Sequence, residues 1–329
     1  MFTRPADVAD AELVAVLAEG WGIDVVSLDY LAVGFGSHHW RAATASTEWF
    51  VTVDDLTAKR REPGETVPHT RARLYAALAT AAELRDDGYG FVVAPVRCDG
   101  GQVATDFGYR YVVTLYPLVD GQKHAYGRYS DPHHRDAVVA LVAELHRSPQ
   151  RCRRWALTET FSIARRAELF DACSHPQDRW ESGPFGEPAR QLLAGHAPAV
   201  ERAFERYDSL AKIVRSRPDR FVLTHGEPHP ANTITTDRGV MLVDWDTTLI
   251  APPERDLWDL TSEDASVAGR YESRTGVGLD PRAIELYRLA WDLSEIAICV
   301  SDFRQPHERT DDTAEGWQNL QHFLDPTRW

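Results

Sequence analysis

The chain has 329 residues, which is more than one average domain and suits two lobes with a cleft between them. Its charge and composition exclude several classes of protein. Its 36 Lys+Arg against 50 Asp+Glu give a net charge of −14, which argues against nucleic acid and anionic membranes as partners. No apolar run reaches the roughly 18 residues of a membrane span, and the four cysteines are far apart without metal-ligand spacing, so we expect a cytoplasmic protein with reduced thiols.

The first third of the chain is patterned as β-strands around one main helix. A surface helix is expected near the N-terminus, before strands that alternate about a turn with Gly34 and Gly36. Three more strands are expected at residues 49–56, 90–96 and 110–119. An alanine- and leucine-rich helix is expected between the first two of them, at residues 71–85. This pattern predicts an N-terminal lobe, residues 1–117, with a small antiparallel sheet and a helix packed on it.

Helical periodicity dominates from Asp131 onward, and we expect helices at residues 136–148, 158–172, 187–216 and 280–303. One β-hairpin interrupts them, "FVLTHGEPHPANTITTDRGVMLVDWD", residues 221–246, with its turn at residues 237–239. The second lobe is therefore expected to span residues 118–329, mainly helical with one embedded hairpin. The fold class predicted is α+β, in two lobes.

The hairpin concentrates side chains with specific chemistry, namely His225, Glu227, Asn232, Asp244 and Asp246. Its turn would bring Asn232 and Asp244 together across adjacent strands. An amide oxygen beside a carboxylate is a hard, oxygen-rich site that suits Mg²⁺. A carboxylate five residues before the asparagine can orient an acceptor hydroxyl and accept its proton, as in kinase-type phosphoryl transfer. Asp246 is either a further ligand or a solvated residue at a strand end.

The motif from His225 to Asn232, the strand that ends in "VDWD" and the later "APPERDL" resemble those of aminoglycoside phosphotransferases and related small-molecule kinases. The similarity is greatest to spectinomycin phosphotransferases, and it includes the segment "YPLV" at residues 116–119. The resemblance implies a bilobal protein-kinase-like fold that uses ATP or GTP with Mg²⁺. It also implies roles for individual residues: Glu227 as the base, Asn232 and Asp244 on Mg²⁺, His225 bracing the loop, and the backbone near Tyr116 and Leu118 reading adenine.

The first departure from the family pattern is Glu227, which stands where the family carries aspartate. Unperturbed Asp and Glu differ by only about 0.4 pKa units, so geometry rather than basicity is affected. A misplacement of about 1 Å can cost on the order of 10²-fold in rate. Pro228 restricts Glu227 to extended backbone conformations, so the loop could be built around the longer side chain.

The second departure is Thr52, which occupies the place of the family's phosphate-binding lysine on the strand. Its expected partner on the following helix is also absent, because Tyr75 stands about where a glutamate belongs. The chain has only three lysines, of which Lys59 is the first. Lys59 lies seven residues beyond Thr52, out of reach along a continuous strand at about 3.3 Å per residue. It could help only if the chain folds back after "VDDL".

Weaker signals concern the nucleotide and the acceptor. The turn "GFGSHHW", with Gly34, Gly36 and Ser37, could cover phosphates with backbone N–H groups. Three tryptophans could line an acceptor pocket or pack in the core, and we leave both roles open for Trp245, Trp258 and Trp291. Arg255 and Asp256 are expected to organise the loop rather than to act in catalysis. The pairs His38–His39 and His133–His134 lack metal-site spacing and are expected at the surface.

Two functions of different class fit this sequence. The first is an ATP- and Mg²⁺-dependent O-phosphotransferase acting on a small, cationic acceptor such as an aminoglycoside or aminocyclitol antibiotic. The acidic composition and the run "WDLTSEDAS" after the hairpin favour a cationic acceptor. The second is a non-catalytic or repurposed kinase-fold binding protein, which would explain both Glu227 and Thr52.

Overall fold

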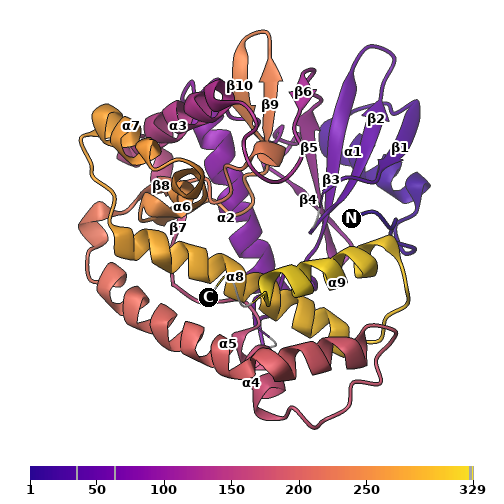
Figure 1. The fold of residues 1–329 in the computed structure, drawn as a ribbon. Helices are drawn as coiled ribbons and strands as arrows, with labels where there is room; N and C mark the ends of the chain where they lie inside the picture. The colour runs from indigo at the N-terminus through magenta and orange to yellow at the C-terminus, as the bar shows by residue number, and fades with distance from the viewer. Residues whose placement is uncertain (35, 63, 326–327, 329) are drawn as a thin grey trace.

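The computed structural model describes residues 1–34, 36–62, 64–325 and 328 and confirms a protein-kinase-like fold (Figure 1). The amino-terminal part is a five-stranded antiparallel sheet in the order β1-β2-β3-β5-β4. Its strands are β1 (Ser27–Leu31), β2 (His38–Ala43), β3 (Glu48–Asp55), β4 (Thr105–Phe107) and β5 (Tyr111–Pro117). The expected strand at residues 90–96 does not form, since only Val92 makes an isolated bridge, to Leu242.

Two helices, α1 (Asp10–Trp21) and α2 (Val67–Asp86), pack on opposite faces of this sheet. Along β3, Val51 and Val53 belong to the same buried cluster as the apolar side of α1. Because successive strand residues point to opposite faces, Thr52 and Asp54 lie on the other face, the one on which α2 packs. The N-terminal helix α1 therefore covers one face of the sheet and buries its apolar side there, with its polar side at the surface.

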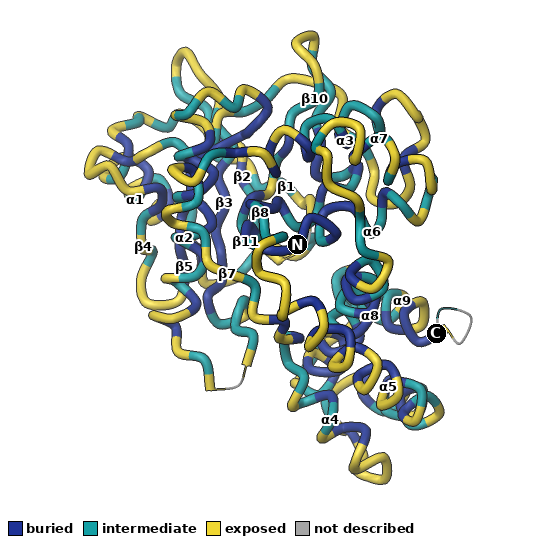
Figure 2. The backbone as a smooth tube through the Cα atoms, turned by 90° about the vertical axis from the view of Figure 1, so that its left-hand side faces the viewer, coloured by how far each residue is buried: buried dark blue, intermediate teal, exposed yellow. Residues whose placement is uncertain are grey.

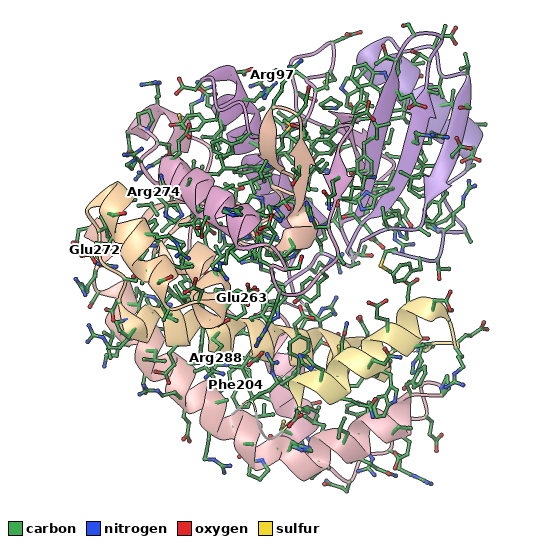
Figure 3. All side chains as sticks on the ribbon, turned by 45° about the horizontal axis from the view of Figure 1, so that its top comes forward. Arg97, Phe204, Glu263, Glu272, Arg274 and Arg288 are labelled. Atoms are coloured by element: carbon green, nitrogen blue, oxygen red, sulfur yellow. The ribbon has the colours of Figure 1, made fainter. Side chains whose placement is uncertain are left out.

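The carboxyl-terminal part is built on two long helices, α5 (Gly186–Arg215) and α8 (Pro281–Arg304). The buried side of α5 faces α8, while its other side is exposed (Figure 2). Phe204 lies in this core, and the guanidinium of Arg166 sits 4.6 Å above its ring (Figure 3). The remaining helices are α3 (Pro132–His146), α4 (Arg166–Ser174), α6 (Glu254–Glu263), α7 (Ser266–Thr275) and α9 (Asp311–Phe323).

Sequence periodicity found four of the carboxyl-terminal helices and misjudged one of them. The helix expected at residues 158–172 begins only at Arg166, because residues 157–158 pair with a strand instead. The helices α7 and α9 were not anticipated. No described helix is long and apolar enough to cross a membrane. The division at residues 117 and 118 stays a prediction.

Two small sheets carry the segment that was expected to form one hairpin. The hairpin proper consists of β9 (Thr233–Thr236) and β10 (Gly239–Leu242), with β6 (Gln122–Lys123) paired beside β9. The strand β8 (Val222–Thr224) pairs instead with β11 (Leu249–Ala251), which also pairs with β7 (Leu157–Thr158). The expectation of a single hairpin over residues 221–246 was therefore wrong: its first strand belongs to a different sheet from its last.

A second buried cluster anchors both small sheets. It includes Leu223 of β8, Leu242 of β10 and Trp245, together with residues of α2, α3, α6 and α7. All three of these side chains are 0 % exposed. Well-packed interiors resist displacement, so the polar residues that follow Leu223 and Leu242 project from fixed points.

Candidate active site

The loop between β8 and β9, residues 225–232, is fixed at its start by the buried carboxylate of Asp256 in the first turn of α6. Its two oxygens accept the backbone N–H groups of His225 at 2.8 Å and Gly226 at 2.6 Å. His146 Nε2 lies 3.0 Å from the same carboxylate. Burial acts against the charge of Asp256, but the hydrogen bond and charge interaction with His146, together with the charge of Arg255, outweigh it and hold the pKa below its ordinary value. Asp256 therefore organises the loop, as expected.

Arg255 ties the same loop to its neighbours. Its guanidinium donates to Thr224 Oγ1 at 3.0 Å and to the carbonyl of Thr247 at 2.8 Å. Gly226 lies against it with φ = +111°, and a Cβ there would come within 2.5 Å of Arg255 Nη1. Only glycine meets both conditions, so the loop turns closely around the guanidinium.

His225 is buried and bonded on both ring nitrogens. Its Nε2 donates to the carbonyl of Val243 at 2.9 Å, and its Nδ1 accepts the backbone N–H of Glu227 at 3.2 Å. Burial lowers the pKa of His225, and this pair of bonds fits a neutral ring with its proton on Nε2. The imidazole thus connects the loops that carry Glu227 and Asp244, and it does not face the cleft as an acid or base.

Glu227 lines a pocket, and 31 % of its side chain is exposed. Burial and the nearby negative charge of Asp246 raise the pKa of its carboxyl to about 7. The loop beyond it is held in turn, because Tyr129 donates its hydroxyl to the carbonyl of Pro228 at 2.7 Å. A carboxylate with a pKa near neutrality is well matched to accepting a proton at physiological pH.

Asn232 ends a short 3₁₀ turn and lies beside the strand that leads to Asp244. Its Nδ2 donates to the carbonyl of Glu227 at 3.0 Å, and its own carbonyl accepts the N–H of Val243 at 3.0 Å. The amide orientation that satisfies the first bond leaves Oδ1 as the side-chain atom available to another group. The structure therefore places Asn232 opposite the start of the "VDWD" segment, as the sequence predicted.

Asp244 has a backbone conformation that few residues other than glycine adopt, with φ = +65°. The next residue, Trp245, is 0 % exposed and donates Nε1 to the carbonyl of Leu242 at 2.9 Å. This buried ring fixes the short segment in which Asp244 and Asp246 lie on either side of it. Partial desolvation and then the charge of Asp246 raise the pKa of Asp244, and because Asp244 is exposed to solvent, part of that repulsion is screened.

The side-chain oxygen atoms of Asn232 and Asp244 are of the type that binds a divalent cation. Among the residues that the structure describes, no group of three or more His, Cys, Asp or Glu side chains forms a metal site. Mg²⁺, however, is commonly held by one or two protein oxygens and completes its shell with water and substrate phosphates. The amide oxygen of Asn232 and the carboxylate of Asp244 fit such a partial donor set.

Lys59 lies at this same place, because the chain folds back after "VDDL". Its Nζ is 2.6 Å from Asp246 Oδ2 and 3.1 Å from Asp54 Oδ1. Burial opposes its charge, but Asp246 and then Asp54 outweigh this and raise the pKa of Lys59 above its ordinary value. The condition stated from the sequence is met, since β3 ends at Asp55 and the chain turns back, with the N–H of Lys59 bonded to the carbonyl of Asp55 at 3.0 Å.

Thr52 and Tyr75, which stand at the family's lysine and glutamate positions, have other partners. Thr52 Oγ1 lies 3.3 Å from His39 Nδ1, and Tyr75 donates its hydroxyl to the carbonyl of Ala104 at 3.0 Å. The acidic partners of Lys59 come instead from β3 itself and from the segment after Asp244.

The glycine turn between β1 and β2 is joined to this network through Ser37. Gly34 and Gly36 have φ of +67° and +81°, which the turn requires, whereas residue 35 lies outside the described part. The hydroxyl of Ser37 donates to Asp54 Oδ1 at 2.6 Å, so this side chain is engaged within the protein. Contacts between the turn and a nucleotide stay a prediction.

The segment after β5 has free backbone groups. Tyr116 pairs with Phe50 in the sheet, but the N–H groups of Leu118 and Val119 bond to no described residue. Backbone groups without a partner can bond to a planar heterocycle, and the reading of adenine by this segment stays a prediction.

A pocket next to Glu227 contains two of the three tryptophans. Trp258 and Trp291 line it together with Tyr126 and Asp259, and their rings lie 6.0 Å apart. Trp245, by contrast, is a packing residue. Of the two roles considered for the tryptophans, Trp258 and Trp291 therefore line a pocket and Trp245 packs in the core.

Comparisons with known proteins agree with this geometry. The profile of the phosphotransferase enzyme family matches residues 39–287, well over half of the chain. The chain belongs to this family.

The chain is also similar to individual members of this family and to solved structures. Protein StrN of Streptomyces griseus is 29% identical over 255 residues, which cover 74% of this chain and 75% of that protein. The spectinomycin phosphotransferase APH(9)-Ia, in complex with ADP and spectinomycin, has a TM-score of 0.75 and 16% identity, covering 97% of this chain and 96% of that one. Choline kinase LicA from Streptococcus pneumoniae has a TM-score of 0.57 and 14% identity, covering 96% and 99%. These structural likenesses show a shared fold.

The histidine pairs of this phosphotransferase were misjudged from the sequence. His38 and His39 are half-buried on β2, and His134 is buried with Nε2 2.9 Å from Thr233 Oγ1, so only His133 of the four lies at the surface as expected. For Lys59 the sequence left open whether the chain folds back after "VDDL", and the structure shows that it does. An aspartate such as Asp55 can cap a turn of this kind.

Replacement of Asp256 by asparagine should destabilise this phosphotransferase by about 3–5 kcal/mol, because it removes the charged partner from buried donors. Asp256 has a lowered pKa, so its stabilising effect is present above the unfolded pKa of about 3.9 and disappears as pH falls through the folded pKa. Denaturant unfolding should show the gap between wild type and Asp256→Asn at pH 7 and its closure below about pH 4.

The matched control is Asp237→Asn in the exposed turn of the β9–β10 hairpin, which should change stability by less than about 0.5 kcal/mol. A loss below about 1 kcal/mol in Asp256→Asn would contradict the organising role.

Proposed function

We propose that the protein is an ATP- and Mg²⁺-dependent O-phosphotransferase for a small, cationic, hydroxylated acceptor of the aminocyclitol or aminoglycoside type, such as spectinomycin. The observation that carries the proposal is the position of Glu227, which lies at the wall of the Trp258–Trp291 pocket and on the loop that also holds Asn232. A base, an amide that could bind a metal and one wall of a small pocket are thereby combined on one short loop.

In this proposal the residues divide the work of phosphoryl transfer. The acceptor hydroxyl attacks the γ-phosphorus, its proton passes to the carboxylate of Glu227, and the bond to the β-phosphate oxygen breaks to release ADP. Asn232 and Asp244 would hold Mg²⁺, which neutralises negative charge on the phosphates and on the transferring group. His225 keeps both loops in register, and the backbone of Tyr116 and Leu118 would bind the adenine.

The charge around the pocket supports a cationic acceptor. Asp259 lines the pocket beside Glu227, and burial followed by the charge of Glu227 raises the pKa of nearby Glu295 to about 7. Of the other acids in "WDLTSEDAS", Glu263 accepts the N–H of Tyr129 and Asp264 pairs with Arg135 at 2.7 Å. Asp259 is therefore the acid of that run which faces the acceptor side.

Related proteins support the same chemistry. The solved structure of APH(9)-Ia contains ADP and spectinomycin, and choline, the substrate that names another structural relative, is a cation. The competing hypothesis of a non-catalytic binding protein depended partly on the missing lysine at position 52. The ammonium of Lys59 at the site weakens that argument.

Asp244→Ala should abolish turnover and remove the Mg²⁺-dependent part of nucleotide binding while leaving the fold intact. In the wild type, ATP with Mg²⁺ at 100 times its dissociation constant should add about 2.7 kcal/mol of stability, and EDTA should reduce this gain. Thermal shift with ATP and Mg²⁺ against ATP and EDTA measures the effect. Asp237→Ala is the control, and near-normal turnover in Asp244→Ala would refute the proposed function.

Glu227→Gln should lower kcat by about 10²–10⁴-fold, because the amide keeps the volume of the side chain but cannot accept the proton. Glu227→Asp should also lose activity, by on the order of 10²-fold, since the carboxylate would be displaced by about 1 Å. Steady-state kinetics of both variants and of the exposed control Glu201→Gln test this. A higher kcat in Glu227→Asp would mean that the site is shaped for the shorter acid.

A panel of hydroxylated antibiotics and metabolites, with mass detection of the phosphorylated product, should identify a cationic acceptor. The KM for this acceptor should rise with added salt. It should also be higher in Asp259→Asn than in the wild type, while the KM for ATP stays unchanged in that variant. Asp237→Asn serves as the control. A preferred acceptor that is anionic, or a KM insensitive to salt, would contradict this assignment.

A further inference from the structure

Lys59 has contacts that a solvated surface lysine would lack. Its ammonium lies between Asp54 on β3 and Asp246 in the segment after β10, with 15% of the side chain exposed. Each partner is connected to one part of the proposed nucleotide site. Asp54 accepts the hydroxyl of Ser37 in the glycine turn, and Asp246 follows Asp244 by two residues. The ammonium therefore lies between the turn that would cover phosphates and the residues that would hold Mg²⁺.

The turn that carries Lys59 is held from the side of the sheet. Asp55 Oδ1 accepts the N–H and the hydroxyl of Thr57 at 2.8 and 2.6 Å. Its other oxygen takes two bonds from Arg110, at 3.0 and 2.6 Å. Leu56 between them is fully buried. The reversal of the chain after β3 is therefore fixed by side chains of the sheet itself.

The same turn is also held from the helical side. Arg73 of α2 donates to the carbonyl of Lys59 at 2.6 Å, and Arg165 donates to that of Ala58 at 3.1 Å. Lys59 thus projects from a backbone that four charged side chains fix. Positioning of this quality is typical of a residue whose head group must occupy one place.

The neighbouring strand positions cannot supply a cation. Thr52 has a neutral hydroxyl, and its partner His39 is uncharged near pH 7, because burial lowers the pKa of His39 to about 3. The guanidinium of Arg255 is already bonded to Thr224 and Thr247. A triphosphate that enters beside Asp54, Asp246, Asp244 and Glu227 meets strong repulsion unless positive charge is present.

We propose that Lys59 is the phosphate-binding cation of this enzyme, moved from the strand to the turn after it, with Asp54 and Asp246 as the acids that position it. An ammonium has three N–H donors. Asp54 and Asp246 take two of them, and the third is left for an oxygen of the nucleotide's phosphate chain. The inference rests on the proposed function, since it assigns a residue for nucleotide binding at the same site.

Titration calorimetry of Lys59→Met with adenosine, AMP, ADP and ATP, each with Mg²⁺, separates this role from simple packing. A phosphate contact predicts unchanged affinity for adenosine, within about twofold, and a loss of about 10- to 150-fold for ATP, the effect of one hydrogen bond to a charged group. KM for ATP should rise accordingly, with KM for the acceptor unchanged. Lys212→Met, an exposed lysine on α5, is the matched control.

Lys59→Gln provides a second variant if methionine prevents folding, because glutamine can still donate hydrogen bonds to Asp54 and Asp246 without carrying the charge. Equal losses for adenosine and ATP, or no loss for ATP, would overturn the assignment of Lys59 while leaving the proposed function standing. Failure of the wild-type protein to bind any nucleotide would instead overturn the proposed function, and the assignment with it.

Discussion

The buried carboxylate of Asp256 is the interaction on which the proposed catalytic centre depends. A charge removed from water is tolerated only when donors surround it, and here the donors are the backbone N–H groups of His225 and Gly226 together with His146. The carboxylate therefore sets where the β8–β9 loop begins. Every side chain on that loop, Glu227 included, takes its position from this point.

Two further constraints carry that position across the cleft. His225 bonds to the carbonyl of Val243, and Trp245 is buried directly after Asp244, so the loop and the "VDWD" segment are joined into one unit. The positive φ of Asp244 is the local cost of this arrangement. The ion pairs of Lys59 with Asp54 and Asp246 then join this unit to the five-stranded sheet. The two parts of the chain meet through charge at the place where a nucleotide's phosphates would lie.

Local patterning was a good guide wherever neighbouring residues determine the structure. Strands such as β3 and β5 and long helices such as α5 and α8 follow from periodicity, and the spacing from His225 to Asn232 marked the proposed site. It was a poor guide where the partner is distant. Residues 90–96 are as apolar as a strand but bond to distant neighbours only at single points, Leu242 and Leu115, which form no described ladder. In the same way, β8 pairs with β11 rather than with the hairpin that follows it.

The sequence by itself determined the fold class and the family and indicated the residues of the proposed catalytic motif, because these are encoded in short-range spacing and in types of side chain. Only the tertiary structure decided that Lys59 reaches Asp246, 187 residues further along the chain. It also decided that His134 is buried and that Trp258 and Trp291, but not Trp245, line a pocket. The physical reason is that a side chain's charge and exposure depend on which distant segments pack beside it, and a one-dimensional pattern does not contain that information.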